Sequence, residues 1–351
     1  MSDHQPSPPA DKHLHHTPVS VLDLAPIVEG GSASDSFGRS LDLARHAERW
    51  GFHRFWMAEH HNMPGIASSA TSVLIGHVAG GTTSIRVGSG GIMLPNHAPL
   101  VIAEQFGTLE SLYPGRIDLG LGRAPGTDQP TARALRRNSG MSGKDFPDLL
   151  DELLHYFQPA GAPEQQTIRA IPGEGLSIPI WLLGSSGFSA ELASQHGMPF
   201  AFASHFAPDY LMQALRLYRE QFQPGFLSTP YAMVGLSIIA ADTAEEAHRL
   251  ATSQQQQILN MIRGKRGPLQ PPVDSMDALW DQHEKHIVEA QMSYAIIGDK
   301  QTVRERLHAV LRETQADEFI IATQVYDHQA RLHSYELVYE IMQEAREAEP
   351  R

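Results

Sequence analysis

Three consecutive residues, Glu59, His60 and His61, place a carboxylate beside two imidazoles directly after a short apolar run. An imidazole with a pKa of about 6.5 exchanges protons near neutral pH, so His60 is a candidate general base. A metal site is a second interpretation. Neighbouring strand residues point to opposite faces, however, so His60 and His61 cannot readily share one ion. We therefore predict proton transfer without a bound metal, with a structural role at a strand end as the alternative.

A second group of residues has the composition of an anion site. Gly184 is followed, at the turn from a predicted strand into a predicted helix, by the small hydroxyl residues Ser185, Ser186 and Ser189. Free N–H groups and the helix dipole favour a phosphate at such a turn, although plain capping of the helix by serine explains the same residues equally well. Arg123 follows another strand and offers a guanidinium suited to phosphate, with an ordinary surface arginine as the alternative.

Glycines form a third group. Gly88, Gly90 and Gly91 lie in one apolar run, where the missing side chains let the backbone approach a flat ligand. A β-bulge would use the same residues. The sequence has no Gly-Lys-Ser/Thr phosphate loop and no GxGxxG pattern at its first predicted strand-to-helix turn. Neither a P-loop nor a Rossmann dinucleotide site is therefore predicted.

The elements that must position these residues alternate regularly from residue 19 onward, as βα units around a parallel sheet do. Strands are predicted at residues 19–27, 52–58, 85–93, 117–121, 180–183, 200–203, 233–240 and 318–325. Helices are predicted at residues 37–50, 68–80, 99–112, 146–157, 189–196, 208–222, 244–262 and from 329 onward. Eight such units predict an α/β fold of the (β/α)8 TIM-barrel class rather than a doubly wound sheet.

TIM barrels carry their active sites at the C-terminal ends of the strands, which is where the three groups above fall. Further polar residues at these ends lie in residues 94–97, 204–205 and 324–326. Two insertions interrupt the rhythm, residues 126–145 after strand 4 and residues 263–294 between strands 7 and 8. Loops of this length are usually lids or disordered. Their basic residues suit either an anionic ligand or plain surface: Arg133, Arg136, Arg137, Arg263, Lys265 and Arg266.

Composition sets the remaining limits. The 351 residues carry a formal net charge of −13, which argues against a nucleic-acid partner. Cysteine is absent, so disulfides and thiolate chemistry are excluded. The sequence lacks both an apolar run of membrane-spanning length and a signal peptide, so we expect a cytoplasmic protein with no membrane association. Residues 1–17 are expected to be a disordered polar tail, and residues 18–347 a single domain.

Several of these segments together resemble the bacterial luciferase-like monooxygenases. The resemblance lies in Trp-Met-Ala-Glu-His-His (residues 56–61), Val-Gly-Ser-Gly-Gly-Ile-Met-Leu-Pro (87–95) and Ala-Glu-Gln (103–105). It continues in Pro-Gly-Arg-Ile-Asp-Leu-Gly-Leu-Gly-Arg (114–123), Trp-Leu-Leu-Gly-Ser-Ser (181–186) and Ile-Gly-Asp (297–299). Each piece is weak alone, and their ordered combination is specific.

The resemblance implies a TIM barrel that uses reduced FMN and O2 on a small organic substrate, or in a sister group the deazaflavin F420. It implies that His60 is the active-site histidine beside the isoalloxazine. Gly90–Gly91 matches a non-prolyl cis peptide under the flavin. Arg123 with Ser185, Ser186 and Ser189 matches a phosphate clamp beside Gly184, and Glu59 would orient neighbouring groups at the rim.

The resemblance also implies partners: a separate NAD(P)H:flavin reductase, because the chain has no second domain, and a second copy of the chain in a homodimer. Two departures count against light emission on long aldehydes. Gly122 stands where luciferase has a reactive cysteine, and Ser185 replaces an acidic residue of its phosphate region. The alternatives are an F420-dependent hydride-transfer enzyme on the same fold and a non-catalytic flavin-binding protein.

Overall fold

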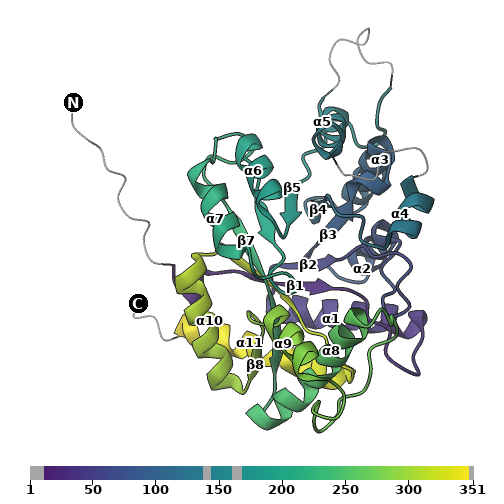
Figure 1. Cartoon of the computed structure of the whole chain (residues 1–351). Coiled ribbons are helices and arrows are strands. Elements are labelled where there is room, and N and C mark those ends of the chain that lie inside the picture. Colours follow the sequence, from purple (N-terminus) through teal and green to yellow (C-terminus); the bar gives the residue numbers. More distant parts are fainter. Residues whose placement is uncertain (1–11, 137–143, 160–167, 348–351) are drawn as a thin grey trace.

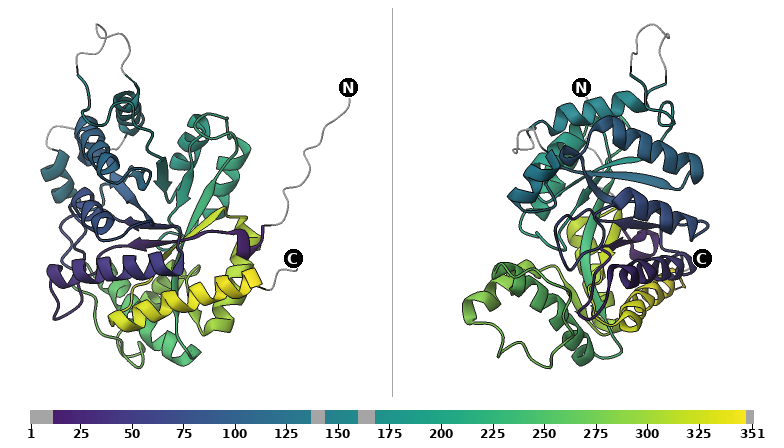
Figure 2. Two further views of the ribbon diagram at one scale, coloured as in Figure 1. Left: turned by 180° about the vertical axis from the view of Figure 1, so that it is seen from behind. Right: turned by 90° about the vertical axis from the view of Figure 1, so that its right-hand side faces the viewer.

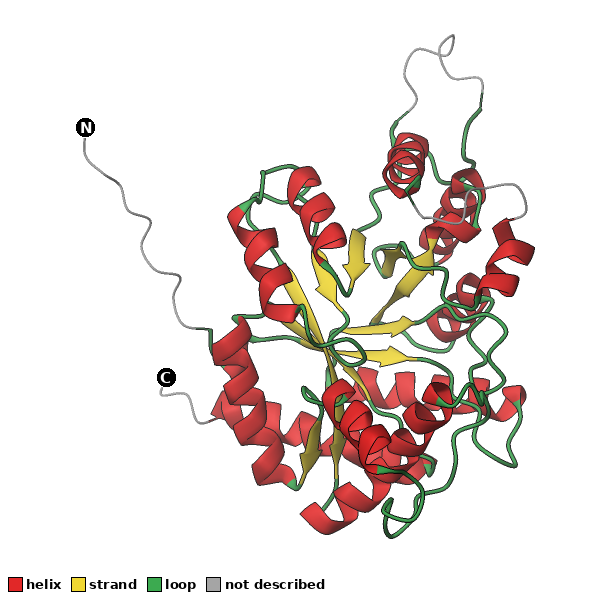
Figure 3. Ribbon diagram, in the orientation of Figure 1, coloured by secondary structure: helices red, strands yellow, loops and turns green. Residues whose placement is uncertain are grey.

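The computed structural model describes residues 12–136, 144–159 and 168–347 and shows a ring of parallel strands surrounded by helices (Figure 1). The strands, yellow in Figure 3, lie at the centre of the molecule. They are β1 (Val19–Asp23), β2 (Arg54–Met57), β3 (Arg86–Met93), β4 (Ile117–Gly122), β5 (Ile180–Gly184), β6 (Phe200–Phe202), β7 (Ala232–Ala240), β8 (Ile296–Gly298) and β9 (Glu318–Ala322).

Eight of these strands close the barrel. They pair in parallel in the order β6-β5-β4-β3-β2-β1-β9-β7, and pairing of β6 with β7 completes the ring. β8 pairs instead with the last residues of β7, Ile238 to Ala240, and β9 is the eighth strand of the barrel. The predicted TIM barrel is therefore confirmed.

Helices cover the outside of the barrel. They are α1 (Ala33–Trp50), α2 (Thr71–Gly80), α3 (Pro99–Leu112), α4 (Gln129–Arg136), α5 (Phe146–Phe157), α6 (Gly187–His196), α7 (Leu211–Glu220), α8 (Ala244–Ile262), α9 (Gln282–Gln291), α10 (Lys300–Thr314) and α11 (His328–Glu347), with short 3-10 turns at Leu14–His16 and Leu94–Asn96. The first and last, α1 and α11, lie side by side (Figure 2). Within the described ranges, none of these helices is long and apolar enough to cross a membrane.

The local sequence explains where a helix such as α1 begins and ends. Ser32 and Asp35 form a reciprocal capping box at its start, which satisfies N–H groups that have no partner inside the helix. Gly51 ends it with φ at 77°, a left-handed conformation that glycine adopts without a steric penalty.

Apolar side chains form two layers. The larger layer fills the space between the strands and the surrounding helices. The smaller fills the inside of the barrel, where Trp56 and Trp181 meet edge to face with ring centroids 5.2 Å apart. Because these rings occupy the interior, a ligand has room only at an end of the barrel.

A buried ion network lies at the N-terminal ends of the strands. Arg54, the first residue of β2, donates to Asp118 at 2.7 Å and to Glu318 at 3.1 Å. Arg86, the first residue of β3, donates to the other oxygen of Asp118 at 2.6 Å. Both carboxylates are fully buried. The network therefore ties β2, β3, β4 and β9 together at the end of the barrel opposite the predicted active site.

The N-terminal segment differs from the expectation of a disordered tail. Leu14 is buried in the main core, and Lys12 forms an ion pair with Asp317. The prediction is therefore wrong for residues 12–17, because one apolar side chain finds a place in the core. Residues 1–11 lie outside the described part of the chain.

Both insertions contain helices. The first includes α4, while its residues 137–143 lie outside the described ranges. In the second, Leu269 forms a parallel bridge with Val28, and α9 packs on α8 through a small apolar cluster of Ile258, Leu259, Met276 and Val288. The right-hand view of Figure 2 shows this segment extending to one side of the barrel.

Candidate active site

Glu59 lies two residues beyond β2, and its buried carboxylate joins the loops that follow β2 and β3. One oxygen accepts the Met93 N–H at 2.9 Å, while the other accepts His61 Nε2 at 2.7 Å and His97 Nε2 at 3.0 Å. Burial alone would raise the pKa of this carboxyl, but the donors outweigh it and lower the pKa to about 2. Protein donors thus surround both oxygens, so we assign Glu59 to positioning the rim loops rather than to contacting a cofactor.

His60 is half-buried beside the Glu59 carboxylate, and its Nδ1 lies 3.3 Å from the Gly126 carbonyl oxygen. A carbonyl only accepts, so Nδ1 carries the ring proton and Nε2 holds a lone pair. Burial lowers the pKa of this imidazole, an effect that the hydrogen bond to Gly126 and the charge of Glu59 only partly offset. The ring is therefore neutral near pH 7 and able to accept a proton through Nε2.

Gly90 and Gly91 lie within β3, and the peptide bond between them is cis. A Cβ at Gly91 would lie 2.8 Å from the Gly120 carbonyl oxygen, and one at Gly90 would lie 2.7 Å from the Leu22 side chain. The register between β3 and β4 shifts across this pair. A larger residue at Gly91 would therefore displace β4, and one at Gly90 would displace side chains inside the barrel.

Arg123 lies at the N-terminus of α6. Its guanidinium is 4.1 Å from the ring centroid of Phe188, the second residue of that helix. Among the residues that the structure describes, Arg123 has no hydrogen bond or ion pair. The structure thus brings an uncommitted cation to the helix end that the sequence singled out.

The serines of this turn have different surroundings. The helix begins at Gly187 rather than at Ser189, so Ser186 is its N-cap, and the Ser186 side chain makes no capping hydrogen bond. Ser189 is buried, and a Cβ at Gly184 would lie 2.6 Å from its Oγ. Ser189 therefore packs the first turn of α6 against the end of β5. Ser185 and Ser186 are half-buried and remain the serines suited to bind an anion.

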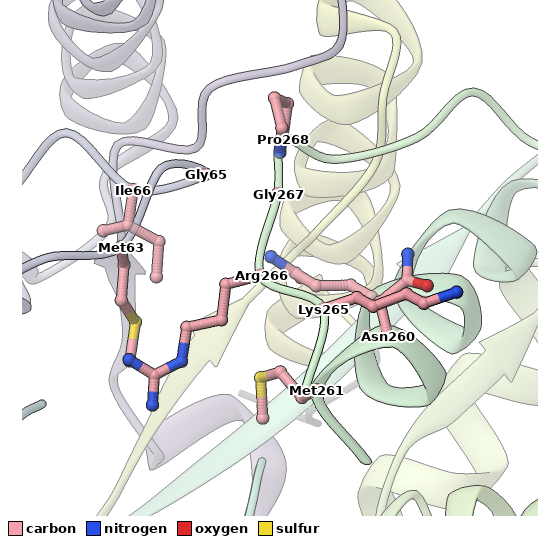
Figure 4. Close-up of a pocket in the computed structure, with 10 residues that line it drawn as sticks. Met63, Gly65, Ile66, Asn260, Met261, Lys265, Arg266, Gly267 and Pro268 are labelled. Atoms are coloured by element: carbon pink, nitrogen blue, oxygen red, sulfur yellow. The ribbon is translucent and has the colours of Figure 1, made fainter. Parts of the chain in front are cut away.

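Two basic residues of the second insertion are already paired with carboxylates. Arg263 pairs with Glu284, and Arg266 pairs with Asp128, each at 2.7 Å. Arg266 also lines, with Lys265, a pocket of about 40 Å³ between the loop after β2 and the end of α8 (Figure 4). Small-molecule sites occupy roughly 300–1,000 Å³, so this pocket is too small for a flavin.

The arginines of the first insertion differ in their surroundings. Arg136 is buried, and its Nε donates to Asn96 Oδ1 at 2.9 Å. The Asn96 amide nitrogen in turn lies 3.3 Å from Glu59 Oε1, so Asn96 links Arg136 to the Glu59 carboxylate. Arg133 is exposed, and Arg137 lies outside the described residues.

Comparison with known proteins identifies the family of this chain. A family model described as luciferase-like monooxygenase matches residues 17–318. The chain belongs to this family. The match runs from just before β1 to the first residue of β9, so it includes every rim group described above.

Curated relatives in this family match the chain over most of its length. A luciferase-like monooxygenase of Escherichia coli (strain K12) is 57% identical over 93% of this chain and 97% of its own. The N-acetyl-S-alkylcysteine monooxygenase of Bacillus subtilis (strain 168) is 33% identical over 91% of this chain and 96% of its own.

Solved structures share the barrel. Apo-MsnO8 aligns with a TM-score of 0.83 at 33% identity and covers 96% of this chain and 100% of its own. Two others are under 25% identical and bear on the fold alone. The oxygenating constituent of 3,6-diketocamphane monooxygenase from Pseudomonas putida, in complex with FMN, has a TM-score of 0.70 at 21% identity and covers 93% and 97%. An F420-dependent secondary alcohol dehydrogenase has a TM-score of 0.64 at 12% identity and covers 93% and 99%.

Sequence reasoning missed one cluster at this rim. Glu59, His61 and His97 bring a carboxylate and two imidazole nitrogens within 4.8 Å of one another, which is a donor set of the kind that divalent metals use. The hydrogen bonds described above already link these three side chains. Spacing along the chain could not reveal the cluster, because His97 joins it only through the pairing of β3 with β2.

A further histidine at the rim was also missed. His205 is half-buried in the loop after β6, and burial together with nearby His60 lowers its pKa to about 4. Its place at a strand end was visible in the sequence. Its closeness to His60 follows only from closure of the barrel.

Proposed function

We propose that this protein is an FMN-dependent monooxygenase that uses reduced flavin and O2 on a small organic substrate. One observation carries the cofactor assignment: the uncommitted Arg123 guanidinium lies at the N-terminus of α6, where the N-cap serine makes no capping bond. A cation at an open helix N-terminus fits a phosphate monoester such as that of FMN. The FMN complex of a structure with the same fold is consistent with this choice.

Each part of the rim has a distinct role in this proposal. Arg123, Ser185 and Ser186 would hold the phosphate, and the Gly90–Gly91 backbone would lie beneath the flavin ring. Reduced FMN, when bound, supplies the two electrons with which one atom of O2 enters the substrate and the other leaves as water. His60 would accept or return a proton through Nε2, and Glu59 would keep the loop that carries His60 in place.

The phosphate assignment predicts a selective loss of FMN affinity. Replacing Arg123 with alanine should weaken FMN binding by about 1–3 kcal/mol, the usual contribution of a charged hydrogen-bond donor. Riboflavin, which lacks the phosphate, should bind both proteins equally. Titration of each flavin by fluorescence quenching measures both values, with Arg216→Ala, an exposed arginine on α7, as the control. An FMN affinity that stays at the wild-type value would refute the clamp.

His60 should matter for turnover rather than for binding. We expect His60→Ala to leave FMN affinity within about twofold and to lower product formed per reduced flavin by about 10²-fold or more, the usual contribution of a positioned base. Product yield against flavin oxidised is the measurement. His196→Ala, at the C-terminal end of α6 and thus at the opposite end of the barrel, is the matched control. Wild-type yield in His60→Ala would make this histidine structural.

The alternatives differ in measurable ways. F420 has a longer and more acidic tail, which would need further basic contacts, and Arg263 and Arg266 are already paired. Titration with F420 beside FMN therefore decides between the two cofactors. A non-catalytic flavin-binding protein would hold FMN without accelerating its reoxidation in the presence of any substrate.

We also infer the partners and the class of substrate. A separate NAD(P)H:flavin reductase would supply reduced FMN. A homodimer is supported by exposed apolar residues on two neighbouring helices, Val73 on α2 and Val101 and Leu112 on α3. The name of the Bacillus subtilis relative supports a small thioether as the first substrate class to test.

A further inference from the structure

His60 and His205 occupy equivalent places on opposite sides of the barrel. Each lies three residues beyond the end of its strand, β2 for His60 and β6 for His205. In the closed ring, three strands separate β2 from β6 in either direction. The two half-buried imidazoles therefore lie on opposite walls at the mouth of the barrel, and they are near enough for His60 to lower the pKa of His205.

The loop that carries His205 is held on both sides. Ser204 donates its hydroxyl to the Gly235 carbonyl of β7 at 2.6 Å, and the Ala203 N–H donates to the Gly184 carbonyl of β5 at 2.9 Å. Phe206 also contacts the edge of the His205 ring. The position of His205 is thus fixed by both neighbouring strands.

The surroundings of the His205 ring select its tautomer. Its Nδ1 is buried without a hydrogen-bond partner and packs against Gly235, where a Cβ would lie only 2.6 Å away. A proton on Nδ1 would be a buried donor with no acceptor, whereas a lone pair there tolerates contact with a Cα–H group. In the described part of the chain, Nε2 has no hydrogen bond and is not among the buried polar atoms. Nε2 therefore carries the proton and is the accessible donor.

His60 has the opposite arrangement. Its Nδ1 proton is directed to the Gly126 carbonyl, so Nε2 is an acceptor. The mouth of the barrel thus presents one neutral donor and one neutral acceptor from opposite walls. Burial keeps both rings uncharged near pH 7, and a carboxylate would therefore find no positive charge on either ring.

We propose that His205 is a substrate-binding residue, and that its Nε2–H and the lone pair of His60 Nε2 together bind an uncharged group that both accepts and donates hydrogen bonds, such as a carboxamide. This inference rests on the proposed function for the role of His60. It adds the class of substrate group that the site selects, and a residue with no role in holding FMN.

The test uses benzamide and benzoate, two probes of nearly equal shape that differ in charge and in the amide donor. Benzamide should bind the wild-type protein and shift the imidazole ¹⁵N signals of both His60 and His205. His205→Phe should weaken benzamide binding by about three- to tenfold, the range for one neutral hydrogen bond. His205→Gln, which retains a donor, should recover most of the affinity, and benzoate should bind less tightly than benzamide in every case. His196→Phe is the control.

The tautomers can be read directly in the wild-type protein by long-range ¹H–¹⁵N NMR, so the proposal does not depend on the folding of a variant. We expect Nε2–H for His205 and Nδ1–H for His60. An Nδ1–H tautomer at His205, unchanged benzamide affinity in His205→Phe, or benzoate binding as tightly as benzamide would each overturn the proposal. Benzamide binding is measured with and without FMN, so failure of FMN to bind counts against the proposed function and not against this site.

Discussion

Asp118→Asn should lower the free energy of unfolding by about 3–5 kcal/mol, the range for breaking a buried ion pair on one side. Asp118 accepts from Arg54, Arg86 and the Trp56 indole N–H. After the substitution the Arg54 guanidinium keeps only its pairing with Glu318, and Arg86 loses its carboxylate. Two cations then remain in a site that excludes most water, and their desolvation is no longer compensated.

Urea denaturation followed by far-UV circular dichroism measures this loss, with Asp209→Asn at an exposed site as the control. FMN affinity of the folded Asp118→Asn protein should equal that of the wild type, because the network lies at the end of the barrel opposite Arg123 and His60. A change in stability below about 1 kcal/mol would contradict the role of this network.

Glu59→Gln should cost about 2–4 kcal/mol of folding stability and also lower turnover. The size of this loss follows from the pKa of Glu59, which falls from an ordinary 4.5 to about 2 in the folded protein, because each pKa unit corresponds to about 1.4 kcal/mol. Glutamine keeps the shape of the side chain but not its charge, so the hydrogen bonds from Met93, His61 and His97 weaken. The loop carrying His60 then loses its anchor.

The stability difference between the wild type and Glu59→Gln should change with pH in one direction. A depressed carboxyl pKa stabilises the folded state fully above about pH 4.5, and the contribution disappears as the pH falls towards 2. The stability difference between wild type and Glu59→Gln should therefore be constant above about pH 5.5 and shrink below pH 4.5. Urea denaturation across this range measures it, with the exposed Glu220→Gln as the control. A difference that grows on acidification would contradict the assignment.

The barrel could be predicted because its signals are local. The helices at residues 99–112, 146–157 and 244–262 have the bounds that the sequence predicted, since Pro99 marks the start of the first and an amphipathic pattern marks the other two. β8 has three residues, too few for a periodic pattern, and both α9 and α10 went unassigned in the stretch that surrounds it. α9 packs on α8, β8 pairs with β7, and α10 packs against β8 and α11.

The candidate site also has features that the sequence predicts and features that it does not. The strand-end position of Glu59, His60, Arg123 and the α6 turn was readable, because rim residues follow directly from the strand pattern. Contacts between segments that are far apart in the sequence could not be predicted from it. The approach of His97 to Glu59 depends on the register of β2 and β3, and the placement of His205 opposite His60 depends on closure of the ring.

The segment after α8 is attached to the barrel by backbone pairing at both ends, through the bridge of Leu269 with Val28 at its beginning and through β8 on β7 at its end, and between them by the apolar cluster that α9 forms with α8. Hydrogen bonds between main chains do not depend on the identity of the side chains between the two attachments. The intervening residues outside the apolar cluster with α8 can therefore be exchanged between homologues as one segment. Evolution or a designer could vary the approach to the active site there while the barrel folds as before.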